Sequence, residues 1–430
     1  MSLPPSADVV VVGSGITGAA AAAAAAARGA RVVQIEKEQG PAREGSGRAQ
    51  GSLRVQGRHA AELPLAREAL RLWTDAARDH DFELVAGGNL YLATREQELP
   101  LLRRLVEDSH RAGLGSVELL DVAQTRDLIP AAAGPLLGAM WSPGDAHCQP
   151  TTGTQVFVER AKRAGVHVAY GVKALALDVS NGRIAAVKTT RGSIAAGAVV
   201  VAAGVWTGYL TRTAGVPVPI MPVVMSELET APVEALFTPT LRAFGFGARQ
   251  RPNGQVVISA GLNAQVAHGL SLADLHDLRL WLPRALSLRK SLRLHIDTRR
   301  IREQLRHRST VGTALVPDTS PEPAADRALV DDSLHRIAKV IPALSTARAA
   351  RYWGGLVDMT PDGLPIIDGA AGPVGLTVIA GLCGHGFTLG PVLGEIAADL
   401  ALAGRSDYDL HSFRLSRYAA GPVAQPEMMI

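Results

Sequence analysis

The chain has 430 residues, of which 47% are hydrophobic and 20% are charged, and its formal net charge is +4. This composition excludes an intrinsically disordered protein, and the length favours two domains over one simple core. No apolar run reaches the roughly 20 residues that span a bilayer, and the N-terminus lacks the basic region of a signal peptide. We therefore expect a cytoplasmic globular protein.

The two cysteines, Cys148 and Cys383, have no CxxC spacing. A zinc finger, an iron–sulfur cluster and a disulfide framework are therefore not expected, and the sequence predicts no metal site.

The first predicted unit is a strand, a helix and a second strand within residues 8–37. A β-branched run at 9–12 is followed by the glycine-rich turn 13–18, by nine alanines at 19–27 and by a strand that ends in Glu36. Such a run is typical of a strand buried on both faces, and the alanines strongly favour a helix.

Each glycine of this turn has a physical task. Gly13 permits the tight turn, Gly15 lets the backbone approach a pyrophosphate, and Gly18 lets the helix pack closely. Glu36 lies at the usual offset for an acid that binds a ribose. The pattern predicts an ADP-containing dinucleotide, FAD or NAD, and the alternative is a glycine-rich turn without a ligand.

The next segments alternate between loops, helices and short strands. The predicted elements are a loop at 38–60, an amphipathic helix at 62–80, two strands around the turn 87–89, and helices at 96–112, 121–130 and 154–164.

The rest of the chain is richer in strands. We expect strands at 166–170, 172–179, 184–190 and 198–202, β structure at 216–265, a pair of helices at 271–308, a loop at 309–330, a helix at 331–341, a strand at 374–379, a glycine-rich loop at 380–390 and a helix at 392–403. The small residues 203–206 after the fourth strand suggest a place beside the nucleotide.

Four stretches resemble the D-amino-acid oxidase-like (DAO) superfamily of flavoproteins: Val9–Lys37, Gly45–Arg54, Val199–Trp206 and Tyr352–Gly390. Within it, the chain most resembles sarcosine oxidase β-subunits and D-amino acid or D-hydroxyproline dehydrogenases. The resemblance covers nearly everything except about 265–330, and it favours FAD over NAD.

The resemblance implies an α/β fold in which a Rossmann-like FAD-binding domain is joined to an α+β substrate domain with an antiparallel sheet. We place the discontinuous FAD-binding domain at 1–85, 145–215 and 345–430. The substrate domain then takes 86–144 and 216–344, with a basic helical insertion at about 270–310.

The resemblance also implies which residues hold FAD. Glu36 is expected on the adenosine ribose and the backbone of Val172 on adenine. The loop at 384–388 is expected over the pyrimidine edge of the flavin, before a helix that starts near Pro391. The cofactor-binding candidates are Gly13, Gly15, Ile16, Thr17, Gly18, Glu36, Lys37, Ser46, Arg48, Ala49, Gln50, Gly51, Val172, Ala203, Gly204, Trp206, Gly384, His385, Gly386, Phe387 and Thr388.

Four departures from relatives within the superfamily bear on the chemistry. Gly355 stands where some members carry the cysteine that binds flavin covalently, so FAD is expected to be non-covalent. Val357 replaces the carboxylate-binding arginine of glycine oxidase-like members. Ser259 and Thr388 stand where monomeric sarcosine oxidases have lysines, which favours a dehydrogenase over an oxidase.

The implied reaction is oxidation of the C–N bond of an amino acid or small secondary amine. A hydride passes to flavin N5, and the resulting imine hydrolyses. Oxidation of a 2-hydroxy acid and a flavin-holding subunit that is active only in a complex remain alternatives.

Three residues are the catalytic candidates. Arg54 could bind the substrate carboxylate, or it could make an ordinary salt bridge or phosphate contact. His385 could be a polar group near the flavin, or a loop histidine bonded to the backbone. Tyr352 is a weaker candidate, as is His268.

Other polar residues are expected to pack rather than react. Tyr91 is predicted to lie in the core, and His147 and Cys148 are expected to serve packing.

The segment 270–310 is unusually basic and has leucines and Trp281 at helical spacing. It could be a solvated helical hairpin, a surface for an anionic membrane on the inner membrane face, or a docking site for a partner subunit. Nucleic-acid binding is not expected, because no aromatic-basic platform accompanies the charges. The basic residues are Arg279, Arg284, Arg289, Lys290, Arg293, Arg299, Arg300, Arg302, Arg306 and Arg308.

Overall fold

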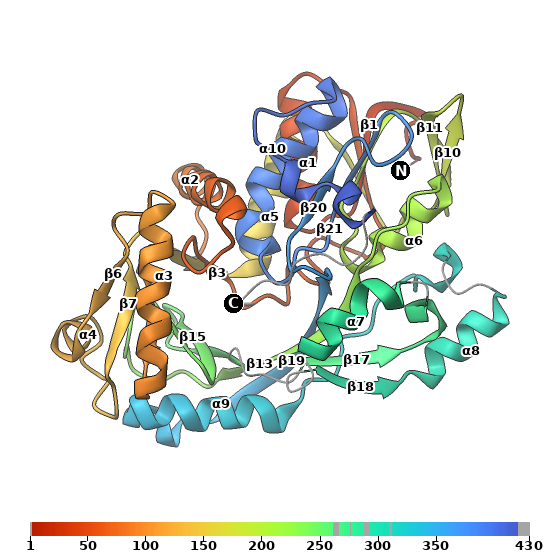
Figure 1. The fold of residues 1–430 in the computed structure, drawn as a ribbon. Helices are drawn as coiled ribbons and strands as arrows, with labels where there is room; N and C mark the ends of the chain where they lie inside the picture. Colours follow the sequence, from red (N-terminus) through yellow and green to blue (C-terminus); the bar gives the residue numbers. More distant parts are fainter. Residues whose placement is uncertain (1, 261–265, 276, 288–291, 309–311, 420–430) are drawn as a thin grey trace.

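The structure is a computed structural model that describes residues 2–260, 266–275, 277–287, 292–308 and 312–419 (Figure 1). Two large sheets and the helices around them form the fold. The sheet that contains the first strand is called the N-terminal sheet below, and the ten-stranded one is called the large sheet.

The N-terminal sheet has a parallel centre with the order β9-β2-β1-β12-β21. Antiparallel strands β10 and β11 extend it beside β12, and β20 pairs with β21. Its strands are β1 (Ser6–Val12), β2 (Val32–Glu36), β9 (His167–Tyr170), β10 (Ala174–Ser180), β11 (Arg183–Thr189), β12 (Gly192–Val201), β20 (Ile366–Asp368) and β21 (Leu376–Ala380). The predicted βαβ start and its parallel sheet are confirmed.

The alanine run forms α1 (Ile16–Ala27), which packs against α5 (Pro150–Arg163) and α10 (Gly386–Ala403). Small side chains on both helices let α1 and α10 approach closely. A Cβ atom at Gly390 would lie 2.5 Å from Ile16, and one at Gly394 would lie 2.4 Å from Ala20. The alanines therefore serve a helix–helix contact as well as the contact with the sheet.

We expect Gly394→Ala to lower the stability of the protein by about 2 kcal/mol, because the added methyl group must push two helices apart. The thermal midpoint of the FAD-loaded protein measures this. Gly144→Ala is the matched control, since a Cβ atom there meets nothing within 4 Å. Equal midpoints for the two variants would contradict the tight contact.

Helix α10 begins at Gly386, five residues before Pro391, so the expected start near Pro391 and the loop at 380–390 are corrected. The glycines and Pro391 in this segment made it resemble a loop in the sequence, but the packing of α10 accommodates them. By length and composition α10 could cross a membrane, but 67% of it is buried inside the protein, as in a core helix.

The large sheet has the order β18-β17-β13-β16-β15-β14-β5-β7-β6, and β19 pairs along the whole of β13. It is mostly antiparallel, but β14 with β5 and β17 with β18 are parallel pairs. Its strands are β5 (Asn89–Ala93), β6 (Glu118–Leu120), β7 (Gly138–Ser142), β13 (Met221–Thr230), β14 (Thr240–Ala243), β15 (Phe246–Gln250), β16 (Val256–Ala260), β17 (Val266–Leu270), β18 (Leu292–Ile296) and β19 (Ala349–Met359).

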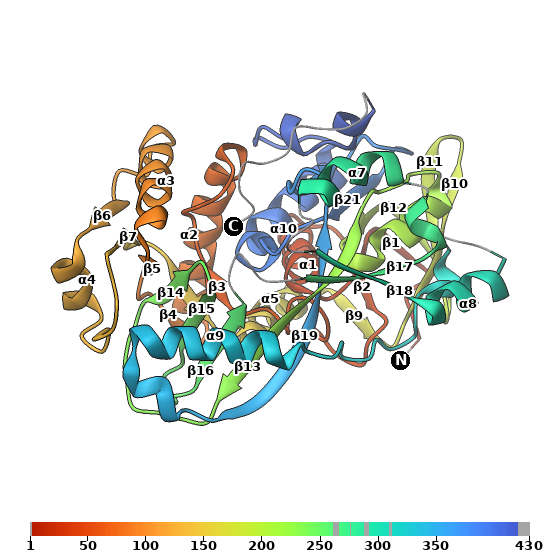
Figure 2. The same cartoon turned by 60° about the horizontal axis from the view of Figure 1, so that its bottom comes forward.

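A helix covers the large sheet on the side away from the N-terminal sheet. Helix α9 (Arg327–Val340) packs Val330 and Ile337 against Leu228 and Ile258. Figure 2 shows α9 beneath the sheet, with α3 (Leu99–Arg111) and α4 (Val122–Leu128) beyond its far end. A third sheet of β3 (Ser52–Leu53), β8 (Ala146–Cys148) and β4 (Leu84–Val85) lies beside α2 (Leu63–Asp79).

Two expectations about elements are corrected. The strands around the turn 87–89 exist as β4 and β5, but they belong to different sheets and form no hairpin. The expected helix pair at 271–308 is α7 (Leu278–Ser287) and α8 (Thr298–Arg306), with the strand β18 between them. Strand β19, which lies within the expected FAD-binding part 345–430, pairs with β13 of the large sheet.

Parts of several predicted segments lie outside the described residues. They are 1 and 420–430 of the expected FAD-binding domain, 261–265 of the expected β region, 276 and 288–291 (with Arg289 and Lys290) of the expected helix pair, and 309–311 of the expected loop.

Candidate active site

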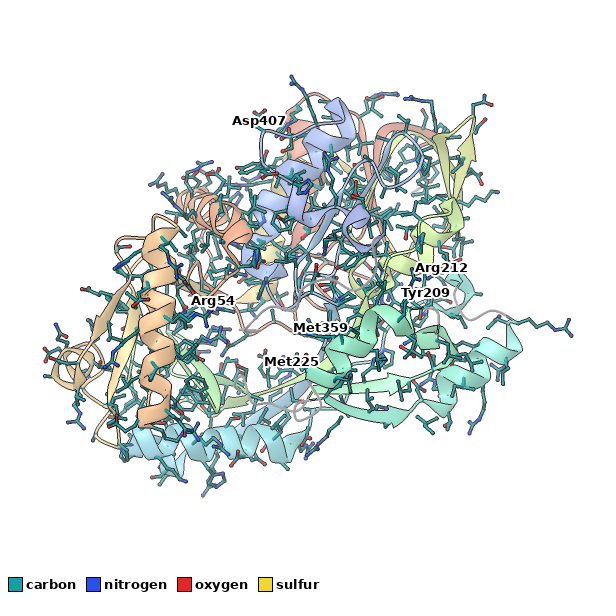
Figure 3. The ribbon with its side chains drawn as sticks, viewed as in Figure 1. Arg54, Tyr209, Arg212, Met225, Met359 and Asp407 are labelled. Carbon is teal, nitrogen blue, oxygen red and sulfur yellow. The ribbon has the colours of Figure 1, made fainter. Side chains whose placement is uncertain are left out.

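A cavity of about 1200 Å³ lies between the N-terminal sheet and the large sheet. In Figure 3, Arg54, Met225 and Met359 lie in this central region. The volume exceeds the roughly 300–1,000 Å³ of an ordinary small-molecule site. The cavity therefore has room for an extended ligand together with a second small molecule.

At one end the cavity meets the turn between β1 and α1. Gly13 has a φ of 111°, and a Cβ atom there would lie 2.4 Å from the carbonyl oxygen of Ala202. The Ile16 N–H donates to Ser46 Oγ at 3.0 Å, so the loop after β2 lies over the first turn of α1. This end is a cradle of backbone and small side chains, as a pyrophosphate requires.

Glu36 is fixed at the carboxyl end of β2. Its carboxylate accepts from the N–H groups of Ser14 at 2.7 Å and Glu38 at 2.9 Å. Burial raises the pKa of Glu36, although these hydrogen bonds oppose the effect. The acid thus lines the cavity and at the same time holds the glycine-rich turn.

Lys37 and Trp206 lie beside this end within a network of acids. The Lys37 ammonium donates to Glu38 at 2.6 Å, to Ser320 at 2.8 Å and to Glu44. Trp206 Nε1 donates to the other oxygen of Glu44 at 2.8 Å. The charge of Lys37 is therefore neutralised by protein carboxylates, and its role is to organise the loop.

The structure brings the predicted cofactor residues together. Every one of them lines the cavity except Gly18, where a Cβ atom would lie 2.2 Å from the carbonyl oxygen of Gly13. Gly18 therefore serves the close packing of helix on turn and does not face the ligand. The glycine cradle, the acid at the end of β2 and the long cavity fit FAD.

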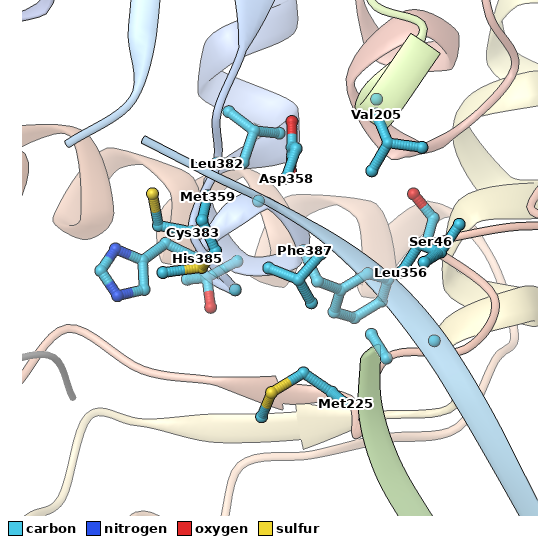
Figure 4. Close-up of a pocket in the computed structure, with 18 of the residues that line it drawn as sticks. Ser46, Val205, Met225, Leu356, Asp358, Met359, Leu382, Cys383, His385 and Phe387 are labelled. Atoms are coloured by element: carbon cyan, nitrogen blue, oxygen red, sulfur yellow. The ribbon is translucent and has the colours of Figure 1, made fainter. Parts of the chain in front are cut away.

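The loop between β21 and α10 forms one wall of the cavity. Figure 4 shows Leu382, Cys383, His385 and Phe387 on this wall and Met225 across from them. The Asp358 carboxylate accepts from the Gly381 N–H at 2.7 Å and fixes the start of the loop. Burial raises the pKa of Asp358 to about 6, although hydrogen bonds from the backbone, including the one from Gly381, act to lower it.

Aromatic packing holds the end of this loop. Trp73 Nε1 donates to the carbonyl oxygen of Thr388 at 3.0 Å, and the Trp73 ring lies 5.2 Å from the Phe387 ring. Thr388 Oγ1 donates to the carbonyl oxygen of Ser52 at 3.2 Å. Thr388 thus joins α10 to the strand that precedes Arg54.

The other end of the cavity is cationic. Arg54, Arg58 and Arg242 all line it. Burial lowers the pKa of Arg54, and the charges of Arg242 and Arg58 lower it further. The Arg54 guanidinium donates to the carbonyl oxygen of Gln56 at 3.2 Å, Arg58 Nε donates to that of Arg54 at 2.8 Å, and Arg242 lies over the Tyr91 ring at 5.8 Å.

Two acids face these three arginines. Asp145 accepts from the Val55 N–H at 2.8 Å, and burial raises its pKa to about 7. Glu62 lies 4.0 Å from Arg58 and binds His385 at 2.8 Å. Three guanidinium groups face two acids, and one of these acids has a pKa of about 7, so this end has an excess of positive charge.

A second polar group lies on the floor of the cavity. Along β13, residues 221, 223, 225 and 227 face the cavity, and the last of these is Glu227. Its Oε2 atom is buried without a hydrogen-bond partner, as are Arg48 Nη1 and Gln50 Nε2, which belong to the same lining. Burial raises the pKa of Glu227 to about 8, partly offset by Arg249.

Tyr352 does not reach the cavity, which corrects its place among the catalytic candidates. Its hydroxyl donates to Asp331 of α9 at 2.7 Å. In the sheet register Tyr352 lies opposite Leu228, whose side chain belongs to the core under α9. The pleat therefore turns Tyr352 to the far face of the large sheet.

The remaining candidates also lie away from the reacting space. His268 is buried between the carbonyl oxygen of Pro222 at 2.7 Å and Asp274 at 2.8 Å. Tyr91, His147 and Cys148 are fully buried, and none of them lines the cavity. Among the described residues no three His, Cys, Asp or Glu side chains are grouped as metal ligands would be.

Sequence reasoning missed Arg58, Arg242, Glu62, Asp145 and Glu227. Only Glu227 could have been recognised from the sequence. It is the one acid among the alternate residues 221, 223, 225 and 227, which face the cavity from β13. The others are brought together by contacts between distant parts of the chain.

The family model described as "DAO: FAD dependent oxidoreductase" matches residues 8–400. Glycine oxidase of Geobacillus kaustophilus (strain HTA426) is 27% identical over 425 residues, which cover 96% of this chain and 97% of that protein.

The fold is similar to that of solved structures over almost the whole chain. The crystal structure of glycine oxidase from Geobacillus kaustophilus has a TM-score of 0.78 at 25% identity and covers 96% of this chain and 100% of that one. L-amino acid deaminase from Proteus vulgaris has a TM-score of 0.87 at 24% identity and covers 97% of this chain and 98% of that one, which shows a shared fold.

Proposed function

Because the chain belongs to the DAO family of FAD dependent oxidoreductases, we propose that it oxidises the C–N bond of an amino acid or a small secondary amine. The observation that carries the proposal is a single cavity that joins a dinucleotide cradle to a cationic end. Glycine oxidase and L-amino acid deaminase act, by their names, on amino acids, which supports the same substrate class here.

FAD is the cofactor, and when bound it supplies the two-electron acceptor for this reaction. We assign its adenosine and pyrophosphate to the end formed by Gly13, Gly15 and Glu36, and its ring system to the space between the loops at 45–51 and 384–388. These segments belong to the proposed FAD-binding parts at 1–85, 145–215 and 345–430.

The cationic end is suited to the carboxylate of an amino acid. Arg54 and Arg242 can offer planar N–H pairs to two carboxylate oxygens. The excess positive charge of this end is complementary to the negative charge of the substrate carboxylate. Arg54 is buried, and the lower local dielectric constant strengthens this pairing.

Two residues that line the cavity bear on which molecule takes the electrons from the reduced flavin. Ser259 lines the cavity and faces Glu227 across the sheet register, and Thr388 is bonded to Ser52. Neither side chain places a cation there to stabilise developing superoxide. This favours a dehydrogenase that passes its electrons to a carrier other than oxygen.

The test is anaerobic bleaching of the yellow FAD-loaded protein by D- and L-amino acids, proline derivatives, sarcosine and hydroxy acids. We expect an amine with a carboxylate to bleach the flavin, and slow recolouring in air. Bleaching by hydroxy acids alone would replace the proposal with a 2-hydroxy acid dehydrogenase. Bleaching by dithionite alone would indicate a subunit that is active only in a complex.

We also propose that the lobe formed by β17, α7, β18 and α8 rests on an anionic membrane surface. The lobe exposes both leucines and arginines, whereas Arg284 and Trp281 of α7 line the cavity. Arg300 packs over Tyr209 at 5.6 Å and is likewise turned inward. The exposed apolar residues are Leu270, Leu275, Leu278, Leu282, Leu286, Leu294, Ile296 and Leu305, and the exposed cations are Arg279, Arg293, Arg299, Arg302, Arg306 and Arg308.

Co-sedimentation with vesicles tests this surface. We expect binding to phosphatidylcholine vesicles that contain phosphatidylglycerol, weaker binding in high salt, and a roughly tenfold loss in the double variant L282D/L286D. Leu128→Asp on α4 is the control, because Leu128 is exposed on another part of the molecule. Failure to bind anionic vesicles would leave two alternatives, a surface exposed to solvent and a docking site for a partner subunit.

A further inference from the structure

One face of α3 lines the cavity, and this face has an apolar part and a charged part. Its residues recur every three or four positions, which places them on one side of an α-helix. The lining residues of α3 are Leu101, Arg104, Leu105, Asp108 and Arg111. In both Figure 1 and Figure 2 this helix lies beside α2, which begins directly after Glu62 of the cationic end.

The apolar part of this face is completed by an aromatic ring from the large sheet. Phe244 follows β14 and lines the cavity, as Leu101 and Leu105 do. All three pack in the hydrophobic cluster that contains Tyr91, and the Phe244 ring lies 5.5 Å from the Tyr91 ring. Leu101, Leu105 and Phe244 are called the apolar pocket below.

The apolar pocket is joined to the cationic end of the cavity through Tyr91. The Arg242 guanidinium lies over the same ring, 5.8 Å from its centre. Burial and then the nearby charge of Arg242 lower the pKa of Arg54, so the two arginines are neighbours. A carboxylate bound to Arg242 therefore lies close to a surface of aliphatic and aromatic carbon.

The charged part of the α3 face forms an exposed rim. Asp108 pairs with Arg104 at 4.0 Å and also with Arg111, and all three residues are exposed. These ion pairs lie within α3, whereas the side chains of the apolar pocket carry no hydrogen-bonding group. A charged substrate side chain in the apolar pocket would lose its water without gaining a partner.

The size of the cavity favours a large substrate as well. Its volume of about 1200 Å³ leaves room beside an extended ligand. A molecule of glycine or sarcosine would leave the apolar pocket facing water. A large apolar side chain would remove this surface from water, which raises affinity about fourfold for each methylene group.

We propose that the substrate is an amino acid with a large apolar side chain, which fills the apolar pocket while Arg242 binds the carboxylate. This inference rests on the proposed function and names the substrate within it. Leu101 and Phe244 are specificity-determining residues, because they contact the side chain of the substrate and not the bond that is oxidised.

The first test is anaerobic bleaching of the FAD-loaded protein by alanine, 2-aminobutyrate, norvaline and norleucine, in the enantiomer that reacts. Each amino acid of this series has one methylene group more than the one before it. We expect kcat/KM to rise about fourfold at each step, or about 50-fold from alanine to norleucine. Equal or falling values along the series would overturn the inference, and so would a higher value with glutamate than with norleucine.

Two substitutions place an amide in the apolar pocket. We expect Leu101→Gln and Phe244→Gln each to lower the ratio of the norleucine value to the alanine value about tenfold, because the longer chain then meets a polar group. Leu119→Gln on β6 is the matched control, since Leu119 is 37% exposed and does not line the cavity. An unchanged ratio in both pocket variants would contradict the assignment.

A binding measurement does not depend on oxidation. Acetate, butyrate and hexanoate present a carboxylate with a growing apolar chain, and hexylamine presents the chain without the carboxylate. In calorimetric titrations of the FAD-loaded protein, we expect Kd to fall about 15-fold for each added pair of methylene groups. Hexylamine is expected to bind at least about tenfold more weakly than hexanoate. A Kd that does not depend on chain length, or equal binding of hexylamine, would overturn the inference.

Failure of this inference and failure of the proposed function give different results. If Kd falls with chain length but no amino acid bleaches the flavin, the proposed function is wrong, although the pocket binds apolar chains. If amino acids bleach the flavin but neither kcat/KM nor Kd depends on chain length, the proposed function stands and the assignment of the apolar pocket is wrong.

Discussion

Replacing Arg242 by methionine is expected to raise the KM for the amino acid substrate about 100-fold. Methionine keeps much of the length of the side chain but removes the charge, and loss of one partner of a buried charged pair costs about 3 kcal/mol. Each factor of ten corresponds to about 1.4 kcal/mol. Arg242→Lys should recover part of the loss, because an ammonium group binds a carboxylate at one point and not two.

The measurement is the concentration dependence of anaerobic bleaching, which separates KM from the limiting rate. Arg336→Met is the control, since Arg336 lies on α9 and pairs with Asp332 outside the cavity. An unchanged KM in Arg242→Met, with Arg54→Met strongly impaired, would mean that Arg54 alone binds the carboxylate. FAD content must match in all variants, because Arg242 packs over Tyr91 in the core.

The nucleotide end could be predicted from sequence because its chemistry is local. The glycines at 13, 15 and 18 and the acid at 36 lie within one strand–helix–strand unit, so their spacing in the chain fixes their spacing in the fold. The structure confirms this βαβ unit. It also separates the role of Gly18, which packs against the turn, from the glycines that face the cavity.

The cationic end could not be predicted in the same way. Arg54 follows β3, Arg242 lies in β14 and Glu62 precedes α2, and their meeting depends on how sheets and helices pack. Tyr352 shows the complementary difficulty. Its motif resembles the family, but the face of β19 on which a side chain lies is decided by the pairing with β13.

The basic segment shows how an amphipathic pattern can be shared between two faces. The spacing of its leucines and arginines predicted amphipathic helices with one face exposed to solvent, and the structure contains the helices α7 and α8. However, Trp281 and Arg284 point into the cavity while Leu282 and Leu286 point outward. Helical spacing identified the element, but only the fold shows that one face of α7 helps to close the cavity.

Glu227→Gln is expected to stabilise the protein at alkaline pH and to leave its stability unchanged near pH 4.5. The folded protein holds this carboxyl protonated up to a pKa of about 8, whereas the unfolded chain releases the proton near 4.5. Between these values the folded state binds one more proton than the unfolded state. Stability of the wild type therefore falls as pH rises, by about 1.4 kcal/mol per pH unit.

The glutamine variant lacks this titration, so the difference between the two proteins should grow with pH to about 4 kcal/mol at pH 8.5. Urea denaturation of the FAD-loaded proteins at pH 5, 7 and 8.5 measures it. Glu229→Gln is the control on the same strand, since Glu229 is paired with Arg251 at 3.1 Å. A variant that is less stable than the wild type at pH 8.5 would mean that a group in the loaded cavity binds the ionised carboxylate. In that case Glu227 would act in the site as an ionised carboxylate and not as a neutral acid.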